Sequence, residues 1–355
     1  MRNPLAFLIG LTFPLILWMS ASSIAIGQCL SQAAVPGRST ASCQCPADRY
    51  FIVSSRHLAS SCVAGDWDSL RFFDSSAGRC RPLSAVEYQA LIEPSRTVVF
   101  YVHGNRMPAD ELMTRFLSVR RFIRPWLEAR PVDWVVFSWP SAKDGFGVSD
   151  FRKKAGRCDL EAVHLAGLLK RHVDHGSPMA MIGYSFGARV ATGALHLLGG
   201  GRMERHVSSE DPVQGAEIRV GLIAPAIESL WLAQRGYHGL ATKNMASMTL
   251  LYNRRDAVLK RYWLLEKVRR ETALGFSGPT RFAPRFDGMR LSVRSRDCSP
   301  NVKLRHAELD YYGTHCNAGR DLALMINSVQ EDSAVIDARL VDVERGADAR
   351  TNRIP

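Results

Sequence analysis

Ser185 stands in a sequence context that could make it a nucleophile. It is the central residue of the segment Gly-Tyr-Ser-Phe-Gly at 183–187, which has the pattern G-x-S-x-G. A run that predicts a strand leads into this segment and a run that predicts a helix follows it at once, as a tight strand-to-helix turn requires. In such a turn the hydroxyl projects from the sheet, and the two glycines leave room for the backbone. The spacing therefore predicts nucleophilic catalysis by Ser185.

A serine nucleophile needs a base, and the base needs an acid that orients it. For a nucleophile in this kind of turn the chain order is serine, acid, histidine. Asp256 follows a predicted strand across a three-residue loop, so we expect it to be the acid, with Glu228 as the alternative. Only His306 and His315 come after Asp256. We expect His306 to be the base because it lies in the loop before the last predicted helix; His315, closer to that helix, is the alternative.

An acyl-transfer site also needs hydrogen-bond donors for the oxyanion. We expect one donor to be the backbone N–H of Phe186, directly after the serine. The segment His-Gly-Asn at 103–105 closes a predicted strand and should supply the second donor, from either Gly104 or Asn105. His103 precedes the serine, so this chain order excludes it as the base, and we interpret it as a structural residue of the loop.

Strands and helices alternate along most of the chain. The run at 97–102 is continuously apolar and rich in β-branched residues, as in a strand covered on both faces, and 134–137 predicts a second buried strand. Further strands are predicted at 179–182, 218–223, 248–252 and 289–293. Helical patterns fall at 109–129, 159–172, 188–198 and 320–329. Two shorter runs, at 50–54 and 70–73, fit leading strands of the same sheet. The alternation predicts an α/β fold with a mostly parallel, doubly wound sheet, whose sites lie at the carboxyl ends of the strands.

Four motifs in order carry a resemblance to a known family. They are Phe-Tyr-Val-His-Gly-Asn at 100–105, Phe-Ser-Trp-Pro-Ser at 137–141, Gly-Tyr-Ser-Phe-Gly-Ala-Arg at 183–189 and Asn-Arg-Arg-Asp-Ala-Val-Leu at 253–259. Residues 95–330 resemble a bacterial branch of the α/β-hydrolase superfamily, which is esterase- or lipase-like and largely of unknown function. The resemblance implies an α/β-hydrolase fold, with Ser185 as nucleophile and Asp256 as acid.

The resemblance departs at the histidine. Relatives tend to carry it two residues before a pair of aromatic residues. Here Leu309 occupies that place before Tyr311 and Tyr312, and His306 stands three residues earlier. This displacement is the main sequence feature that favours a protein without catalysis.

The chain composition and its first residues bear on the compartment. The 355 residues are 46% hydrophobic and 23% charged, which excludes a disordered chain or one made of many membrane spans. The net charge of +12 could favour anionic partners, although a soluble basic surface also explains it. A short apolar stretch at 4–19 follows Arg2 and precedes small residues that end at Gly27, as in an export signal. We therefore expect a secreted or periplasmic protein starting at Gln28, with an uncleaved or lipidated membrane anchor as the alternative.

The cysteines agree with export. There are eight, at positions 29, 43, 45, 62, 80, 158, 298 and 316, and disulfides persist outside the cytoplasm. Five of them precede residue 81, so we expect a cysteine-rich segment at 28–95 that disulfides join to a main domain at 96–330, followed by a polar tail at 331–355. A bond between Cys298 and Cys316 would close a loop that contains His306. Pairing of either one with an N-terminal cysteine stays open.

These observations predict an exported serine hydrolase that cleaves a carboxylic ester through an acyl-enzyme on Ser185. Amides and thioesters are less favoured acyl substrates. We expect no cofactor, no metal and no nucleic-acid partner, and a small-molecule or lipid ester as the substrate, with peripheral or anchored association with the cell envelope as a further option. The alternative is a non-catalytic envelope binding protein on a degenerate α/β-hydrolase fold.

Overall fold

A computed structural model describes residues 47–58, 67–145, 147–204, 206–207, 211–264, 272–313 and 316–329. The expected export signal and the polar tail at 331–355 lie outside these residues. So do four cysteines and the alternative base: Cys29, Cys43, Cys45, Cys62 and His315. Among the described residues, no helix has both the length and the apolar character needed to cross a membrane.

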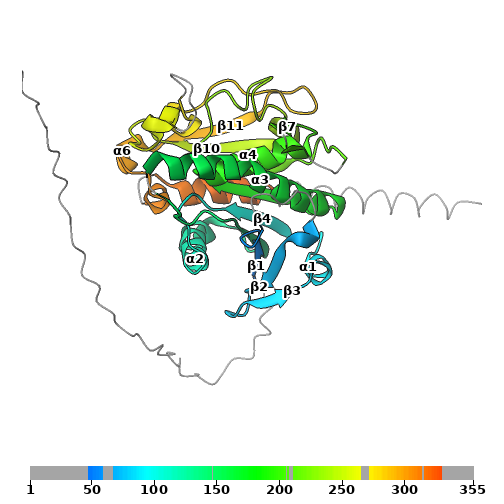
Figure 1. Ribbon diagram of the computed structural model, residues 1–355. Helices are drawn as coiled ribbons and strands as arrows, with labels where there is room; N and C mark the ends of the chain where they lie inside the picture. The colour runs from blue at the N-terminus through cyan, green and yellow to red at the C-terminus, as the bar shows by residue number, and fades with distance from the viewer. Residues whose placement is uncertain are drawn as a thin grey trace, which may run out of the picture. The chain divides into compact units, whose positions relative to one another are not determined.

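Nine strands form a single sheet in the order β11-β10-β9-β6-β4-β5-β1-β2-β3 (Figure 1). Their bounds are Arg49–Ser54 (β1), Arg71–Asp74 (β2), Arg81–Leu83 (β3), Thr97–Val102 (β4), Val132–Ser138 (β5), Met179–Tyr184 (β6), Ile218–Ile223 (β9), Met245–Tyr252 (β10) and Ser292–Asp297 (β11). All pairings from β11 to β1 are parallel, and β2 and β3 add an antiparallel edge. A separate hairpin joins β7 (Arg202–Met203) to β8 (His206–Val207).

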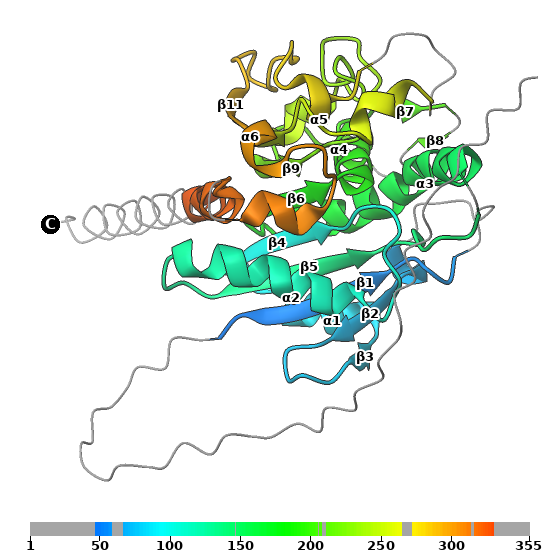
Figure 2. The same cartoon turned by 90° about the vertical axis from the view of Figure 1, so that its left-hand side faces the viewer.

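Helices cover both faces of this sheet. The longer ones are α2 (Leu112–Ile123), α3 (Gly147–Asp174), α4 (Phe186–Leu198) and a helix at 318–329. The α3 and α4 helices pack together on one face, and α2 and the 318–329 helix lie on the other (Figure 2). Shorter helices are α1 (Ala85–Leu91), α5 (Leu274–Ser277) and α6 (Ser299–Val302), with 3-10 turns η1 (Trp67–Ser69), η2 (Arg124–Trp126), η3 (Ala241–Asn244), η4 (Leu259–Leu264) and η5 (Glu308–Tyr312). The predicted α/β, mostly parallel and doubly wound architecture is confirmed.

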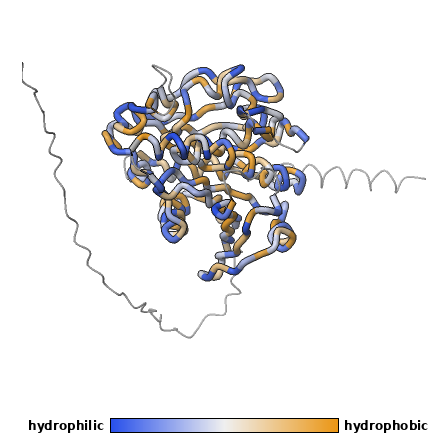
Figure 3. Tube along the Cα trace, viewed as in Figure 1, coloured by the Kyte–Doolittle hydropathy of each residue, from blue (hydrophilic) through white to orange (hydrophobic). Residues whose placement is uncertain are grey.

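The central strands form because their residues suit burial on both sides. Every residue of β4 and of β5 is buried, and β-branched and aromatic side chains pack well on such a doubly covered sheet. The tube coloured by hydropathy shows this apolar centre with more polar segments at the periphery (Figure 3). The two leading strands expected before residue 96 also belong to this sheet, as β1 and β2.

Three predicted elements differ from the structure. The last strand was expected at 289–293, but β11 runs from Ser292 to Asp297 and is mostly exposed. It lies at the edge of the sheet, where a strand needs no apolar run, so polar residues such as Arg294 belong to it. The α3 helix begins at Gly147, not 159, and adds polar turns that an apolar pattern does not reveal. The α2 helix is shorter than 109–129 because Pro125 follows it within the η2 turn.

The strand order reverses between β4 and β6. From β4 the chain continues to its neighbour β5 on one side, and then returns to β6 on the other side. In open parallel sheets, ligands bind outside the carboxyl ends of the strands at such a switch point. The segments that follow β4 and β6 are those at 103–105 and 185–187, which carry the expected oxyanion donors and the nucleophile.

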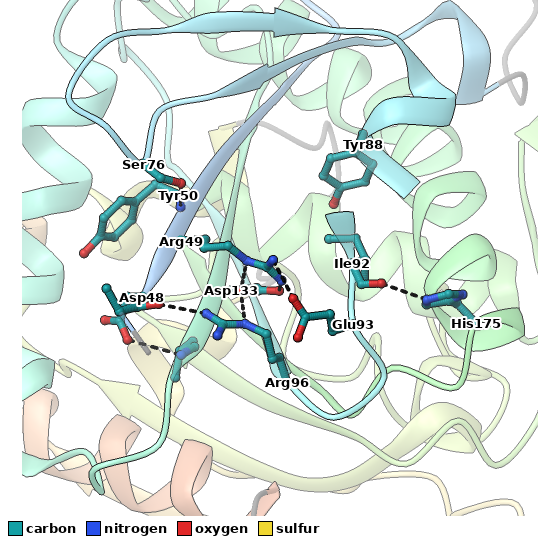
Figure 4. A network of polar contacts seen from close by, with 12 residues as sticks. Asp48, Arg49, Tyr50, Ser76, Tyr88, Ile92, Glu93, Arg96, Asp133 and His175 are labelled. Atoms are coloured by element: carbon teal, nitrogen blue, oxygen red, sulfur yellow. Dashed lines mark hydrogen bonds and ion pairs between the residues drawn. The ribbon is translucent and has the colours of Figure 1, made fainter. Parts of the chain in front are cut away.

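Ion pairs attach the first strand to the sheet. Asp133 of β5 has no exposed side-chain surface and accepts hydrogen bonds from Arg49 of β1, at 2.9 Å and 2.5 Å, and from Arg96, at 2.7 Å (Figure 4). Glu93 contacts Arg49 from the solvent side at 2.8 Å. One buried carboxylate therefore joins two guanidinium groups from different parts of the chain, and Glu93 supplies the second negative charge.

We expect Asp133→Ala to lower the free energy of unfolding by about 3–5 kcal/mol, because it leaves the buried Arg96 without its carboxylate partner. Glu93→Gln acts on the same Arg49 from an exposed position and should cost less than about 1 kcal/mol. Urea unfolding followed by tryptophan fluorescence measures both. Equal costs for the two variants would contradict this account of how β1 is held.

Candidate active site

Ser185 lies in the turn between β6 and α4. Its backbone has φ 52° and ψ −117°, a left-handed conformation that is strained for a residue with a side chain. Two hydrogen bonds fix the turn: Ser185 N donates to Ile223 O at 2.9 Å, and Ala226 N donates to Ser185 O at 3.2 Å. The end of the adjacent strand β9 and the segment that follows it thus hold the predicted nucleophile in place.

The two glycines of the motif permit this turn by their lack of a side chain. A Cβ on Gly187 would lie 2.0 Å from Val102 O, and one on Gly183 would lie 2.8 Å from Ala188 Cα. Neither approach is possible for a residue with a side chain, because both contacts are to backbone atoms. The glycines let α4 start directly against the ends of β4 and β6.

The three predicted catalytic residues are brought together. Ser185 Oγ lies 2.9 Å from His306 Nε2, and His306 Nδ1 lies 2.6 Å from Asp256 Oδ2. Each ring nitrogen thus faces one partner, so the natural tautomer has Nδ1–H donating to the carboxylate while Nε2 accepts the serine proton. This is the geometry in which a base can activate a serine.

The carboxylate of Asp256 is fully buried and held by the backbone. Its Oδ1 accepts hydrogen bonds from the N–H groups of Val258 and Leu259, each at 2.9 Å. The second oxygen is thereby directed to the imidazole. The alternative acid, Glu228, instead accepts a hydrogen bond from Trp231 Nε1 at 2.9 Å, and its backbone forms a bridge to Ala273.

The segment that carries His306 is tied to the acid loop and to β6. Asn253 Nδ2 donates to Lys303 O at 2.7 Å, and Ala257 N donates to Leu304 O at 3.1 Å. From the other side, the hydroxyl of Tyr184 donates to the backbone carbonyl of His306. Asp256 and His306 are therefore positioned as one unit, although they are 50 positions apart in the sequence.

A disulfide closes the same segment. Cys298 and Cys316 are bonded, with their Cα atoms 5.5 Å apart and a sequence separation of 18 positions. The loop so formed contains His306. This is the Cys298–Cys316 pairing expected from the sequence, and not the alternative pairing with an N-terminal cysteine. Two other cysteines among the described residues, Cys80 and Cys158, are free thiols.

His103 supports the loop after β4, in agreement with its interpretation as a structural residue of that loop. It is fully buried, stacks on Trp139 at 5.5 Å between ring centroids, and accepts a hydrogen bond from Trp139 N at 3.2 Å. Burial lowers the pKa of His103 to about 3, so the ring is neutral and donates from Nδ1 to Gly104 O. The Phe-Ser-Trp-Pro-Ser motif thus fixes the loop that carries Asn105.

A cavity of about 610 Å³ opens beside the triad. Ser185, His306, Phe186 and Asn105 all line it, whereas Gly104 is not among its lining residues. Phe186 is the first residue of α4, where a backbone N–H has no acceptor within the helix. The side-chain amide of Asn105 is buried and has no hydrogen-bond partner in the described structure, a state that a bound ligand would relieve.

Sequence reasoning missed several residues of this site. It assigned no role to Tyr184 or Asn253, although both stand inside the four motifs at 100–105, 137–141, 183–189 and 253–259. It also missed the walls of the cavity, which come from the start of α3 and from η4, including Phe151 and Tyr262. The position of Tyr184 next to the nucleophile was the one available signal; the walls depend on tertiary packing and gave none.

No protein-family model matches the chain, and a comparison with curated proteins finds no match. The described residues contain no group of three or more His, Cys, Asp or Glu side chains arranged to hold a metal ion.

Replacing both Cys298 and Cys316 by serine should lower the free energy of unfolding by about 3 kcal/mol, because the cross-link no longer restricts the unfolded chain. Cys80→Ser removes an exposed free thiol and should change it by less than about 0.5 kcal/mol. Urea unfolding under non-reducing conditions measures both. A non-reducing peptide map that joins Cys298 or Cys316 to any other cysteine would contradict the pairing.

Glu308, two residues after His306, is a buried acid without a cationic partner in hydrogen-bond contact. Its carboxylate accepts a hydrogen bond from the hydroxyl of Tyr101, 2.9 Å from both oxygens. Burial raises the pKa of Glu308 from 4.5 to about 7. The folded protein therefore retains a proton on Glu308 that the unfolded chain releases at lower pH.

Because the folded state binds more protons than the unfolded state between pH 4.5 and 7, this group makes the protein less stable as pH rises through that range. Glu308→Gln removes this dependence. The difference in free energy of unfolding, variant minus wild type, should therefore be about 2–3 kcal/mol larger at pH 8 than at pH 5. Chemical denaturation at the two pH values measures this difference, and the exposed Glu111→Gln is the control. Parallel pH profiles for wild type and Glu308→Gln would contradict the assignment.

Proposed function

We propose that this protein is a serine hydrolase of the α/β-hydrolase type that cleaves a carboxylic ester. The observation that carries the proposal is the continuous contact from Ser185 Oγ to His306 Nε2, at 2.9 Å, and from His306 Nδ1 to Asp256, at 2.6 Å, beside a cavity large enough for a substrate. Secretion or residence in the periplasm is part of the proposal, on the strength of the sequence features before residue 28.

In the proposed reaction, Ser185 Oγ attacks the ester carbonyl carbon while His306 Nε2 takes the hydroxyl proton. Asp256 stabilises the resulting imidazolium through Nδ1. The carbonyl oxygen becomes an oxyanion, and the backbone N–H groups of Phe186 and Asn105 are the donors proposed for it. His306 then gives its proton to the leaving alcohol, which leaves an acyl group on Ser185.

Hydrolysis of the acyl-enzyme repeats these roles with water. His306 removes a proton from a water molecule while the water oxygen attacks the acyl carbonyl carbon. The tetrahedral intermediate collapses, Ser185 Oγ recovers the proton, and the carboxylic acid departs. The apolar lining of the cavity favours an ester over a strongly polar substrate, because the lining would bury the acyl chain away from water.

The non-catalytic alternative was favoured by the displaced histidine. In the structure His306 nevertheless lies within hydrogen-bond distance of Ser185, so this displacement no longer distinguishes the two functions. A reagent that reacts only with an activated serine does distinguish them.

A fluorophosphonate probe should label the wild-type protein covalently, and Ser185→Ala should abolish the labelling because the nucleophile is gone. Ser118→Ala, on the exposed side of α2, is the matched control and should label fully. His306→Ala should reduce hydrolysis of 4-nitrophenyl esters by about 10⁴-fold or more, as removal of a triad base does. His315→Ala should have little effect.

Absence of labelling in a folded wild-type protein would reject the proposed chemistry in favour of a binding role. Labelling that survives Ser185→Ala would place the nucleophile elsewhere. A larger loss with His315→Ala than with His306→Ala would transfer the role of base to His315.

A further inference from the structure

The charge of the cavity lining is one-sided. Two of its residues, Arg106 and Arg261, carry guanidinium groups, and none carries a carboxylate. Both arginines are exposed, and in the described structure neither forms an ion pair with an acidic side chain. The acid of the triad, Asp256, is fully buried and compensated by its own hydrogen bonds. A molecule in the cavity therefore meets a positive rim.

Each guanidinium group is held near the cavity by a contact of its own. Arg106 lies over the ring of Phe151, 4.8 Å from the ring centroid, an arrangement that attracts a cation to an aromatic face. Arg261 Nη1 donates to the backbone oxygen of Ala257 at 2.6 Å. Such restraint lowers the entropy lost when a guanidinium binds an anion, so the pair is partly preorganised.

Apart from the two arginines and the residues of the serine site, the cavity lining is apolar. Its walls come from α3, from η4 and from the segment after β9, with aliphatic and aromatic side chains such as Phe151, Leu259 and Tyr262. Two apolar residues of the lining, Val148 and Val258, also remain 37% and 46% exposed. The apolar surface thus continues to the mouth, where a water-soluble polar substrate would not require it.

We propose that the cavity binds an anionic amphiphile: the substrate is an ester with an apolar chain, and Arg106 and Arg261 hold its carboxylate or phosphate group. A planar guanidinium matches either anion through paired hydrogen bonds. The net charge of +12 favours encounter with such a molecule. That the anionic amphiphile is a substrate rests on the proposed ester hydrolysis. That the cavity binds such a molecule does not depend on hydrolysis.

Binding is tested with the full chain carrying Ser185→Ala and three probes of equal chain length: octanoate, octyl phosphate and the neutral octanamide. Tryptophan fluorescence or calorimetry at low salt should show at least one anion binding about tenfold or more tighter than octanamide. The preference should shrink as salt is added. The tighter of the two anions identifies the headgroup as a carboxylate or a phosphate.

Arg106→Gln and Arg261→Gln should each reduce the affinity for the preferred anion by about fivefold, with a smaller change for octanamide. Arg121→Gln removes an exposed arginine that is not in the cavity lining and should change neither affinity. Equal binding of anions and octanamide overturns the inference, and so do arginine variants that weaken all three probes equally.

Two matched pairs of esters test the substrate assignment. The mono-4-nitrophenyl ester of adipic acid is compared with 4-nitrophenyl hexanoate, and 4-hexanoyloxybenzoate with 4-hexanoyloxybenzamide. In at least one pair, kcat/KM of the anionic ester should exceed that of its neutral partner by about fivefold or more. Equal values in both pairs overturn the assignment. If no ester is hydrolysed and Ser185 is not labelled, the proposed function fails, while the binding experiment still decides the inference about the cavity.

Discussion

The strained backbone at Ser185 is the constraint on which the site depends. A left-handed conformation at a residue with a side chain costs of order 1–3 kcal/mol. It persists here because the packing and hydrogen bonds around Ser185 hold the backbone in this conformation. Gly183 and Gly187 bring β6, α4 and the end of β4 into backbone contact. The last residue of β9 accepts a hydrogen bond from the N–H of Ser185, and Ala226, just after that strand, donates one to its carbonyl. The strain is maintained by the core of the sheet, in which every residue of β4 is buried.

His306, the proposed base, depends on a different kind of support. His306 belongs to no strand and sits between β11 and the 318–329 helix, so the sheet alone would not fix it. Three restraints fix its position. The Asn253 side chain donates to the carbonyl of Lys303, the Tyr184 hydroxyl donates to the carbonyl of His306, and the Cys298–Cys316 bond closes the whole segment. Tyr184 is a neighbour of the nucleophile in sequence, so one residue of β6 links the serine turn to the base segment.

This difference explains what the sequence could and could not predict. The central strands and the serine turn have local signals: an apolar run for β4, and glycines at fixed spacing around Ser185. The triad followed from chain order, which left only two histidines to consider. The edge strand β11 and the early turns of α3 are polar and carry no periodic apolar signal. The strand was therefore predicted a few residues too early in the sequence, and the first turns of the helix were missed. The role of the ion pairs at Asp133 was missed for a related reason, since the three charged residues Arg49, Arg96 and Asp133 are distant in sequence.

The least predictable part of the site is the part that would decide its substrate. Ser185, Asp256 and Asn105 all follow ends of parallel strands, whose relative positions are fixed by hydrogen bonding within the sheet. The cavity walls come instead from α3 and η4, which lie outside the sheet and are free to differ without disturbing the triad. Motifs that surround the strand ends therefore indicate a reaction and leave the substrate open. On this chain η4 and the loop after β4 each add an arginine, Arg261 and Arg106, to an apolar cavity. This combination, rather than the serine motif, indicates an anionic ester.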